Sequence, residues 1–118
     1  MGTWDAGIFE DDIAMDIKTE FEDAIAEGLN IKQATKQILE SYEDALDDVD
    51  EGPMVYLALA ALQIEKGTVL RKIKQKALKI IDSGQGLERW EEAGEELLNK
   101  RKCVLNDLKS KLLSTKEI

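Results

Sequence analysis

The apolar residues of this chain recur at three- and four-residue steps, which is the spacing of one face of an α-helix. The first such stripe begins after Asp12 and consists of Ile13, Ile17, Phe21, Ala24 and Ile25. Gly28 follows it, and a glycine at that place is typical of a left-handed helix cap. The pattern therefore predicts an amphipathic helix that begins near Asp12 and ends before Gly28.

A second helix is predicted to begin after Asn30. Gln33 follows three residues later, a spacing typical of a capping box, in which each side chain accepts a hydrogen bond from the other's backbone N–H. The apolar stripe of this helix is Ile31, Ala34, Ile38, Tyr42 and Ala45. The acidic turn "DDVDEG", residues 47–52, is expected to close it.

The next segment, "MVYLALAALQIEKG", is apolar on nearly every face and predicts the central, most enclosed helix. Pro53 suits its first position, where the missing N–H would have no intrahelical partner in any case. Gly67 is expected to end this helix, and Thr68 to cap the next one.

Three further segments carry helical patterns. Residues 69–84 have a basic face opposite an apolar stripe of Val69, Ile73, Ala77, Ile80 and Ile81. Residues 87–94 are long enough for two helical turns. The last stretch has lysines and arginines outside an apolar seam of Leu97, Leu98, Val104, Leu105, Leu108 and Leu112.

No segment alternates with period two for long enough to predict a strand. The short connections favour antiparallel neighbours. We therefore predict an all-α fold, a single domain over residues 1–118, built as a compact bundle of five or six antiparallel helices with an N-terminal loop packed on it.

The charge of the chain is divided unevenly along the sequence. Residues 1–52 hold 16 acids and 3 bases, a net charge of −13, whereas residues 53–118 hold 9 acids and 13 bases, a net charge of +4. This asymmetry bears on partners and association rates rather than on the fold. It also argues against nucleic acid as the ligand of the basic stretch 71–79, because the acidic half would repel a phosphate backbone. That stretch is instead expected to be a solvated face, or a surface that meets an acidic half.

The chain is expected to be cytoplasmic. Its start shows no basic segment followed by an apolar stretch, as a secretory signal would. The densest apolar run, residues 54–64, is shorter than the roughly 20 residues that a membrane-spanning helix needs. Cys103 is the single cysteine, so the chain can form no internal disulfide.

Asp11, Asp12 and Asp16 precede or begin the first predicted helix. Aspartates there can satisfy free backbone N–H groups and match the positive end of the helix dipole. They can also form a protein-binding edge or, least in keeping with the pattern, hold a hard cation. The turn at residues 47–52 fails as an EF-hand loop, because non-ligand residues occupy required positions in either register.

The residue inventory argues against an enzyme and against a bound cofactor. The chain contains no histidine, which removes the commonest general base and every histidine-based zinc site. Cys103 has basic neighbours in sequence but adjoins Val104 and Leu105, so we expect a structural cysteine on the apolar seam. Carboxylates alone can catalyse glycoside hydrolysis, but no aromatic-lined cleft for a sugar is indicated.

Three blocks of the chain resemble a family of small bacterial proteins of unknown function: "MGTWDAGIFEDDIAMD", "DEGPMVYLALAALQIEKG" and "IIDSGQGLERWEE" followed by "KRKCVL". Members of that family open with Met-Gly-Thr-Trp-Gly-x-Gly-x-Phe and an aspartate pair, and this chain departs from them at Asp5. The resemblance implies a bacterial, cytosolic helical domain and supplies no activity. The family-motif positions are Trp4, Gly7, Phe9, Asp12, Asp16, Pro53, Arg89 and Trp90.

Within that family pattern, Trp4 and Phe9 are expected to fold back as an apolar clip on the bundle, and Asp12 or Asp16 to pair with Arg89. The leading functional interpretation is a non-enzymatic module, similar to an immunity or inhibitor protein, whose acidic half binds a basic protein. The alternative is a self-associating structural domain, such as a homodimer. The predicted binding residues are Asp11, Asp12, Asp16, Asp47, Asp48, Asp50 and Glu51.

Overall fold

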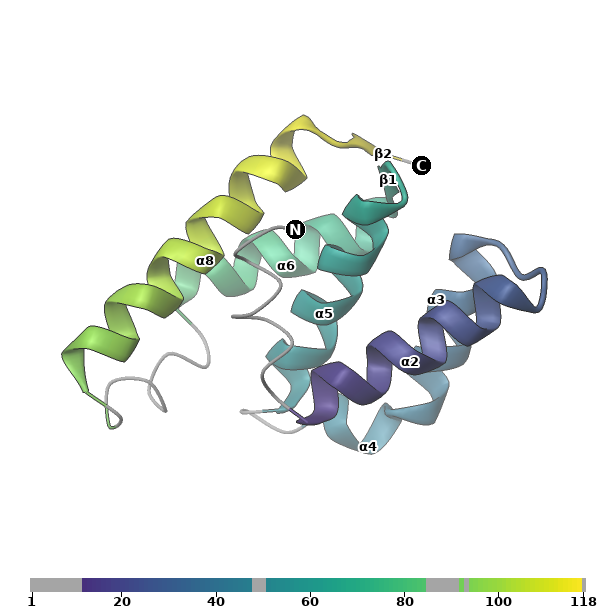
Figure 1. The fold of residues 1–118 in the computed structure, drawn as a ribbon, viewed down its shortest axis with the longest axis horizontal. Coiled ribbons are helices and arrows are strands. Elements are labelled where there is room, and N and C mark those ends of the chain that lie inside the picture. The colour runs from purple at the N-terminus through teal and green to yellow at the C-terminus, as the bar shows by residue number, and fades with distance from the viewer. Residues whose placement is uncertain (1–11, 48–50, 85–91, 93, 118) are drawn as a thin grey trace.

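The computed structural model describes residues 12–47, 51–84, 92 and 94–117, which form helices around one central helix (Figure 1). The elements in chain order are α2 (Asp12–Ala26), α3 (Ile31–Ser41), α4 (Glu43–Leu46), α5 (Glu51–Glu65), β1 (Thr68–Val69), α6 (Arg71–Ser83), α8 (Glu95–Ser114) and β2 (Lys116–Glu117). The predicted all-α fold is confirmed. No helix in this part of the chain is apolar over a stretch that could cross a membrane.

Helix α5 is the core of the molecule. From Val55 to Gln63 every side chain is buried except that of Tyr56, which is half-buried. The helix packs against α2, α4, α6, α8 and β1. An apolar surface on all sides of one helix has to be covered on all sides, so the prediction of a central helix is confirmed.

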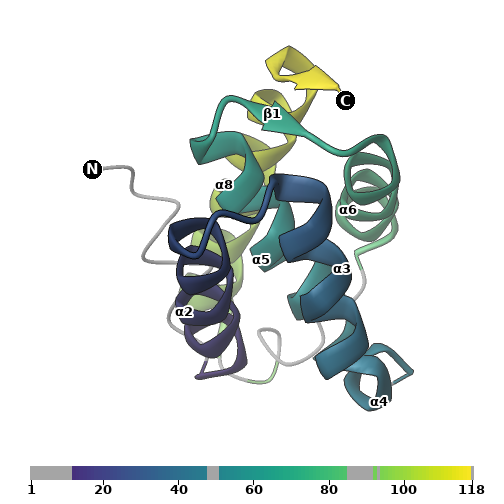
Figure 2. The ribbon, with the colours of Figure 1, turned by 90° about the vertical axis from the view of Figure 1, so that its right-hand side faces the viewer.

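The two halves of the sequence lie on opposite sides of α5. Helices α2, α3 and α4 lie on one side, and α6 and α8 on the other (Figure 1). The acidic and basic halves of the chain thus lie mostly on opposite sides of α5, and they come together where α3 lies beside the start of α6 (Figure 2).

The predicted helix signals at the start of α3 are confirmed. The backbone N–H of Gln33 donates to Asn30 Oδ1 at 2.8 Å, and the N–H of Asn30 donates to Gln33 Oε1 at 3.1 Å. Gly28, which follows α2, has a φ of +103°, a conformation that favours glycine.

Two helix boundaries differ from the prediction. The stripe through Tyr42 and Ala45 does not form one helix, since α3 ends at Ser41 and the four-residue helix α4 follows Tyr42. Helix α5 begins at Glu51, so Pro53 is its third residue rather than its first. The proline is tolerated there because the first four N–H groups of a helix have no intrahelical partner.

The prediction that Thr68 caps α6 is wrong, as is the prediction of no strand. Thr68 and Val69 form β1, which pairs in parallel with β2 in the register Thr68 to Lys116 and Val69 to Glu117. A two-residue strand is too short to show a period-two pattern in the sequence. The residue that precedes α6 is Leu70.

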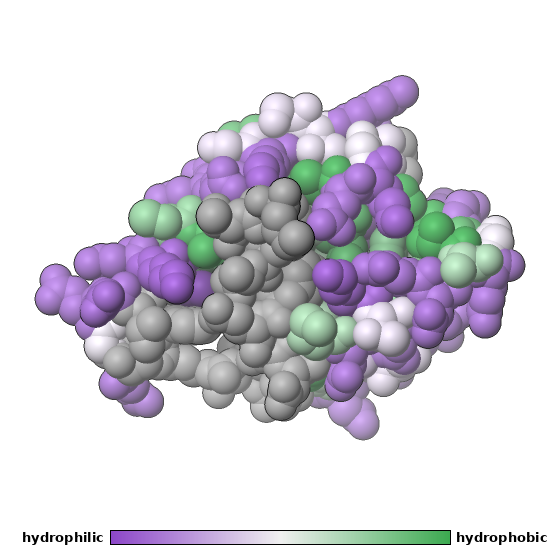
Figure 3. Space-filling view, viewed as in Figure 1, coloured by the Kyte–Doolittle hydropathy of each residue, from purple (hydrophilic) through white to green (hydrophobic). Residues whose placement is uncertain are grey.

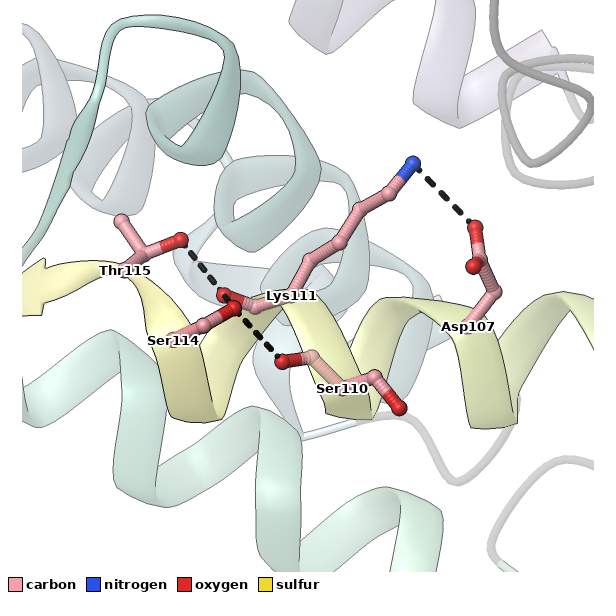
Figure 4. Close-up of polar contacts among 5 residues, drawn as sticks. All are labelled: Asp107, Ser110, Lys111, Ser114 and Thr115. Carbon is pink, nitrogen blue, oxygen red and sulfur yellow. Dashed lines mark hydrogen bonds and ion pairs between the residues drawn. The ribbon is translucent and has the colours of Figure 1, made fainter.

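The end of α8 is held by side chains that bond back to its last turn (Figure 4). The Ser114 hydroxyl donates to the carbonyl of Ser110 at 2.9 Å, and the Thr115 hydroxyl donates to that of Lys111. Lys111 also pairs with Asp107, one turn earlier, at 3.2 Å. The carbonyl of Lys111, which would lack a partner at the helix end, is thus satisfied just before the chain enters β2.

Two predictions about the seam of α8 are wrong. Cys103 is exposed, so it is not a buried structural cysteine. Arg101, expected outside the seam, is 4% exposed, and its Nη2 donates to Met54 Sδ at 3.1 Å. The prediction of the seam itself is confirmed for Val104, Leu105, Leu108 and Leu112, which are all buried.

The predicted N-terminal loop with its clip of Trp4 and Phe9 lies outside the described residues, and so do Gly7, Trp90 and Arg89, the predicted partner of Asp12 or Asp16. The same holds for the short helix expected over residues 87–94, of which only residues 92 and 94 are described.

Gly52, the second residue of α5, lies against the end of α4. A Cβ added there would lie 2.7 Å from the backbone oxygen of Leu46. Glycine to alanine inside a helix is normally stabilising by about 0.5–1 kcal/mol. For Gly52→Ala we expect the opposite sign, a loss of about 1–3 kcal/mol, because backbone atoms must move apart.

Urea unfolding of this variant tests the contact. Gln37→Ala, on the exposed face of α3, is the control and should change the free energy of unfolding by less than about 0.5 kcal/mol. Unchanged or raised stability of Gly52→Ala would contradict a close approach of α4 and α5.

Candidate functional site

Four of the seven predicted binding residues belong to elements that meet at one end of the molecule. Asp12 is the first residue of α2, Glu51 is the first of α5, and Asp47 directly follows α4. The start of α2 lies at the same end of the molecule as α4 in both views (Figures 1 and 2). Asp16, one turn into α2, is exposed, as is Asp47. The other three, Asp11, Asp48 and Asp50, lie outside the described residues.

The positions of two of these acids match the electrostatics of helix ends. Asp12 and Glu51 stand at helix N-termini, where the helix dipole stabilises negative charge. Within the described part of the chain, no three acidic or cysteine side chains come together in a way that could hold a metal ion. Asp47, by contrast, is the residue at the C-terminal end of α4, where the helix dipole does not favour a negative charge.

Helix α2 carries a longer acidic stripe than was predicted. Asp16, Glu20, Asp23 and Glu27 follow one another at steps of four, three and four residues, so they lie on one face of the helix. All are exposed except Glu20, which is half-buried. Mostly hydrophilic side chains cover the outward surface over α2 (Figure 3). The spacing was visible in the sequence, but only Asp16 was included among the predicted residues.

Glu20 connects this stripe to the junction of α3 and α4. One of its carboxylate oxygens, Oε2, is buried with no hydrogen-bond partner. The carboxylate interacts with the Tyr42 phenol. Burial of the phenol, this interaction and the negative charges of Glu20 and Asp16 raise the pKa of Tyr42 above its usual range.

Gln63 is the polar residue buried within α5. Its Nε2 donates to Thr35 Oγ1 at 2.7 Å, and its Oε1 accepts from the backbone N–H of Leu70 at 2.9 Å. One side chain therefore ties α5 to α3 and to the start of α6. A glutamine in an apolar run was the only sequence signal for this role, and its partners could not be read from it.

A groove of about 580 Å³ lies between α3 and the start of α6, which Figure 2 shows beside each other. Leu39, Leu70 and Ile73 give it apolar lining, and Thr35, held by Gln63, also borders it. Its walls come from segments about 35 residues apart in sequence, so no local pattern indicated it.

Replacing Gln63 with leucine tests the polar link. The near-isosteric Gln63→Leu leaves the Leu70 N–H and the Thr35 hydroxyl without their bonds to residue 63, and we expect a loss of about 1–3 kcal/mol in the free energy of unfolding. Gln75→Leu, the same change on the exposed face of α6, is the control and should be nearly neutral. Equal effects of the two substitutions in urea unfolding would contradict the role of Gln63.

The Tyr42 phenol predicts a loss of stability in alkali. Because its pKa is higher in the folded than in the unfolded protein, the stabilisation is complete below about pH 10 and falls as the pH rises further, by up to about 1.4 kcal/mol per pH unit. Unfolding free energies measured between about pH 8 and 11 should show this loss of stability in alkali in the native protein and in the control Tyr56→Phe. The loss should be absent from Tyr42→Phe, and its persistence there would rule out Tyr42 as its source.

Comparisons with known proteins identify the chain at the level of a family. No curated protein and no solved structure matched it. A family model, described as a domain of unknown function (DUF4259), matches residues 2–114, which include α2 to α8. The match covers nearly all of the 118 residues. The chain therefore belongs to the DUF4259 family.

Proposed function

We propose that this protein is a non-enzymatic interaction module whose acidic N-terminal half binds a basic protein. The observation that carries the proposal is the exposure of acidic side chains on one side of α5. The exposed acids of α2, α3, α4 and the residues directly after α2 and α4 are Asp16, Glu22, Asp23, Glu27, Glu40, Glu43, Asp44 and Asp47.

The charge on that side of the molecule is strongly one-signed. Residues 12–47 hold 10 acids and 3 bases, a net charge of −7. A surface of one sign accelerates the capture of an oppositely charged partner and repels like-charged ones. The strand pair and helices on the other side of α5 have ion pairs of their own, including Lys109 with Asp82 at 2.6 Å.

An immunity or inhibitor protein is the specific form of the proposal that these properties support. Such a protein masks a cationic surface, for example that of a nuclease, and needs neither a cofactor nor a catalytic residue. The proposed location is the bacterial cytoplasm. The proposed binding residues are Asp12, Asp16, Asp47 and Glu51 at one end of the molecule, together with the rest of the α2 stripe.

The proposal predicts charge-dependent capture of a basic partner. In the triple variant Asp16→Asn, Asp23→Asn, Glu27→Gln, three exposed carboxylates of the stripe are neutralised. If each contributes about 0.2–1 kcal/mol, the affinity should fall by roughly 3- to 150-fold. The control neutralises three exposed acids elsewhere, Glu92, Glu95 and Glu96, and should bind as the native protein does.

The measurement is a pull-down of the tagged chains from a lysate of the host, washed at low and then at high salt. A stoichiometric basic protein that the native chain and the control retain at low salt, and lose at high salt, is the expected result. Equal retention by the triple variant would place the interface elsewhere. Recovery of the protein alone, with concentration-dependent mass in sedimentation, would favour the self-associating alternative.

A further inference from the structure

The groove between α3 and α6 has the size and lining of a small-molecule site. Its volume, about 580 Å³, falls within the roughly 300–1,000 Å³ that ligand pockets occupy. Leu39 and Leu70 are half-buried, so their exposed parts provide an apolar surface inside the groove, and the fully buried Ile73 lies beneath it. Because Gln63 bonds to both Thr35 and the Leu70 backbone, the two walls are held in place in the folded protein.

Cationic side chains stand on both walls of this groove. Lys32 and Lys36 are one turn apart on α3, and both are exposed. Opposite them, Arg71 and Lys72 form the exposed first two residues of α6. Four positive charges thus converge from two elements, although the chain as a whole has a net charge of −9.

The acidic residues of the groove lie toward its other end. Glu40 follows Leu39 near the end of α3, and Glu43 begins α4. Along α3 the lining therefore changes from cationic at Lys32 and Lys36, through apolar at Leu39, to acidic at Glu40. This order gives the groove a direction: a negative group fits the cationic end, and an apolar body fits the middle.

We propose that this groove binds a small amphipathic anion, with a carboxylate or phosphate head between the cations of α3 and α6 and an apolar body over Leu39 and Leu70. The site is separate from the acidic stripe of α2, so it does not depend on the proposed protein partner. Burial of the apolar body supplies affinity, and the four cations select the sign of the head group.

Glu117 competes with the anionic head group of a ligand for Arg71. The β1–β2 pairing places this residue opposite Val69, and its Oε1 lies 3.7 Å from Arg71 Nε. The Arg71 side chain is 73% exposed, so the pair is long and well hydrated and is easily replaced by a ligand. Neutralising Glu117 should therefore leave Arg71 more available to an anion.

Calorimetric titration of the full chain tests the proposal with three probes that share one chain length. Decanoate and decyl phosphate carry the two anionic heads, and decyltrimethylammonium carries a cation, each used below its micelle concentration. We expect both anions to bind with a stoichiometry of one and the cation to bind at least about tenfold more weakly. Tighter binding of decyl phosphate identifies a phosphate site, and tighter binding of decanoate a carboxylate site.

Variants then place the bound anion. Lys32→Gln with Lys36→Gln should weaken decanoate binding by about tenfold, since each lost charge contact is worth about 0.2–1 kcal/mol. Glu117→Gln should tighten it by roughly two- to fivefold. The control Lys66→Gln with Lys79→Gln removes the same charge from exposed lysines that do not line the groove, and should leave binding unchanged.

Three results would overturn the proposal. The first is that the cationic probe binds as tightly as the anions do. The second is that no probe binds. The third is that the two lysine double variants weaken decanoate binding equally. Weaker binding by Glu117→Gln would likewise exclude Arg71 as a contact of the head group. Thermal melts of each variant confirm that the altered binding is measured on folded protein.

Discussion

Helix α5 needs cover on all of its sides, and this single requirement arranges the other elements. Its buried leucines, Leu57, Leu59 and Leu62, each contribute about 1.5–3 kcal/mol only if neighbouring helices exclude water from them. Each surrounding helix supplies one apolar face and turns its polar face outward. The segregation of charge follows, because the helices before α5 are acidic and those after it carry most of the bases.

The polar residue buried inside α5, Gln63, also affects the surface of the molecule. Gln63 is fully buried, so its amide must find partners or weaken the fold by the full cost of desolvation. Its partners belong to α3 and to the residue before α6, and these are the two walls of the groove. A hydrogen-bond requirement of the core thus sets the geometry of a feature on the surface.

The parts of this structure that could be predicted are those that depend on nearby residues. The capping box of Asn30 and Gln33 needs only a three-residue spacing, and the enclosed α5 needs only its own composition. The break at Tyr42, the burial of Arg101 and the exposure of Cys103 depend on what other elements place beside them. For the site, acidic residues at helix starts were found from position, whereas the groove requires the fold itself.

The strand pair formed by β1 and β2 bears on how the chain folds as it is synthesised. Lys116 pairs with Thr68, which precedes it by 48 residues, whereas α2 and α3 are neighbours in sequence that pack directly on each other. Contacts between distant residues form later, because a longer loop must close first. On the ribosome the acidic side can therefore assemble around α5 while the basic side is still emerging. The apolar surface of α5 that faces α6 and α8 stays uncovered until then, and that interval is when the nascent chain is most exposed to aggregation.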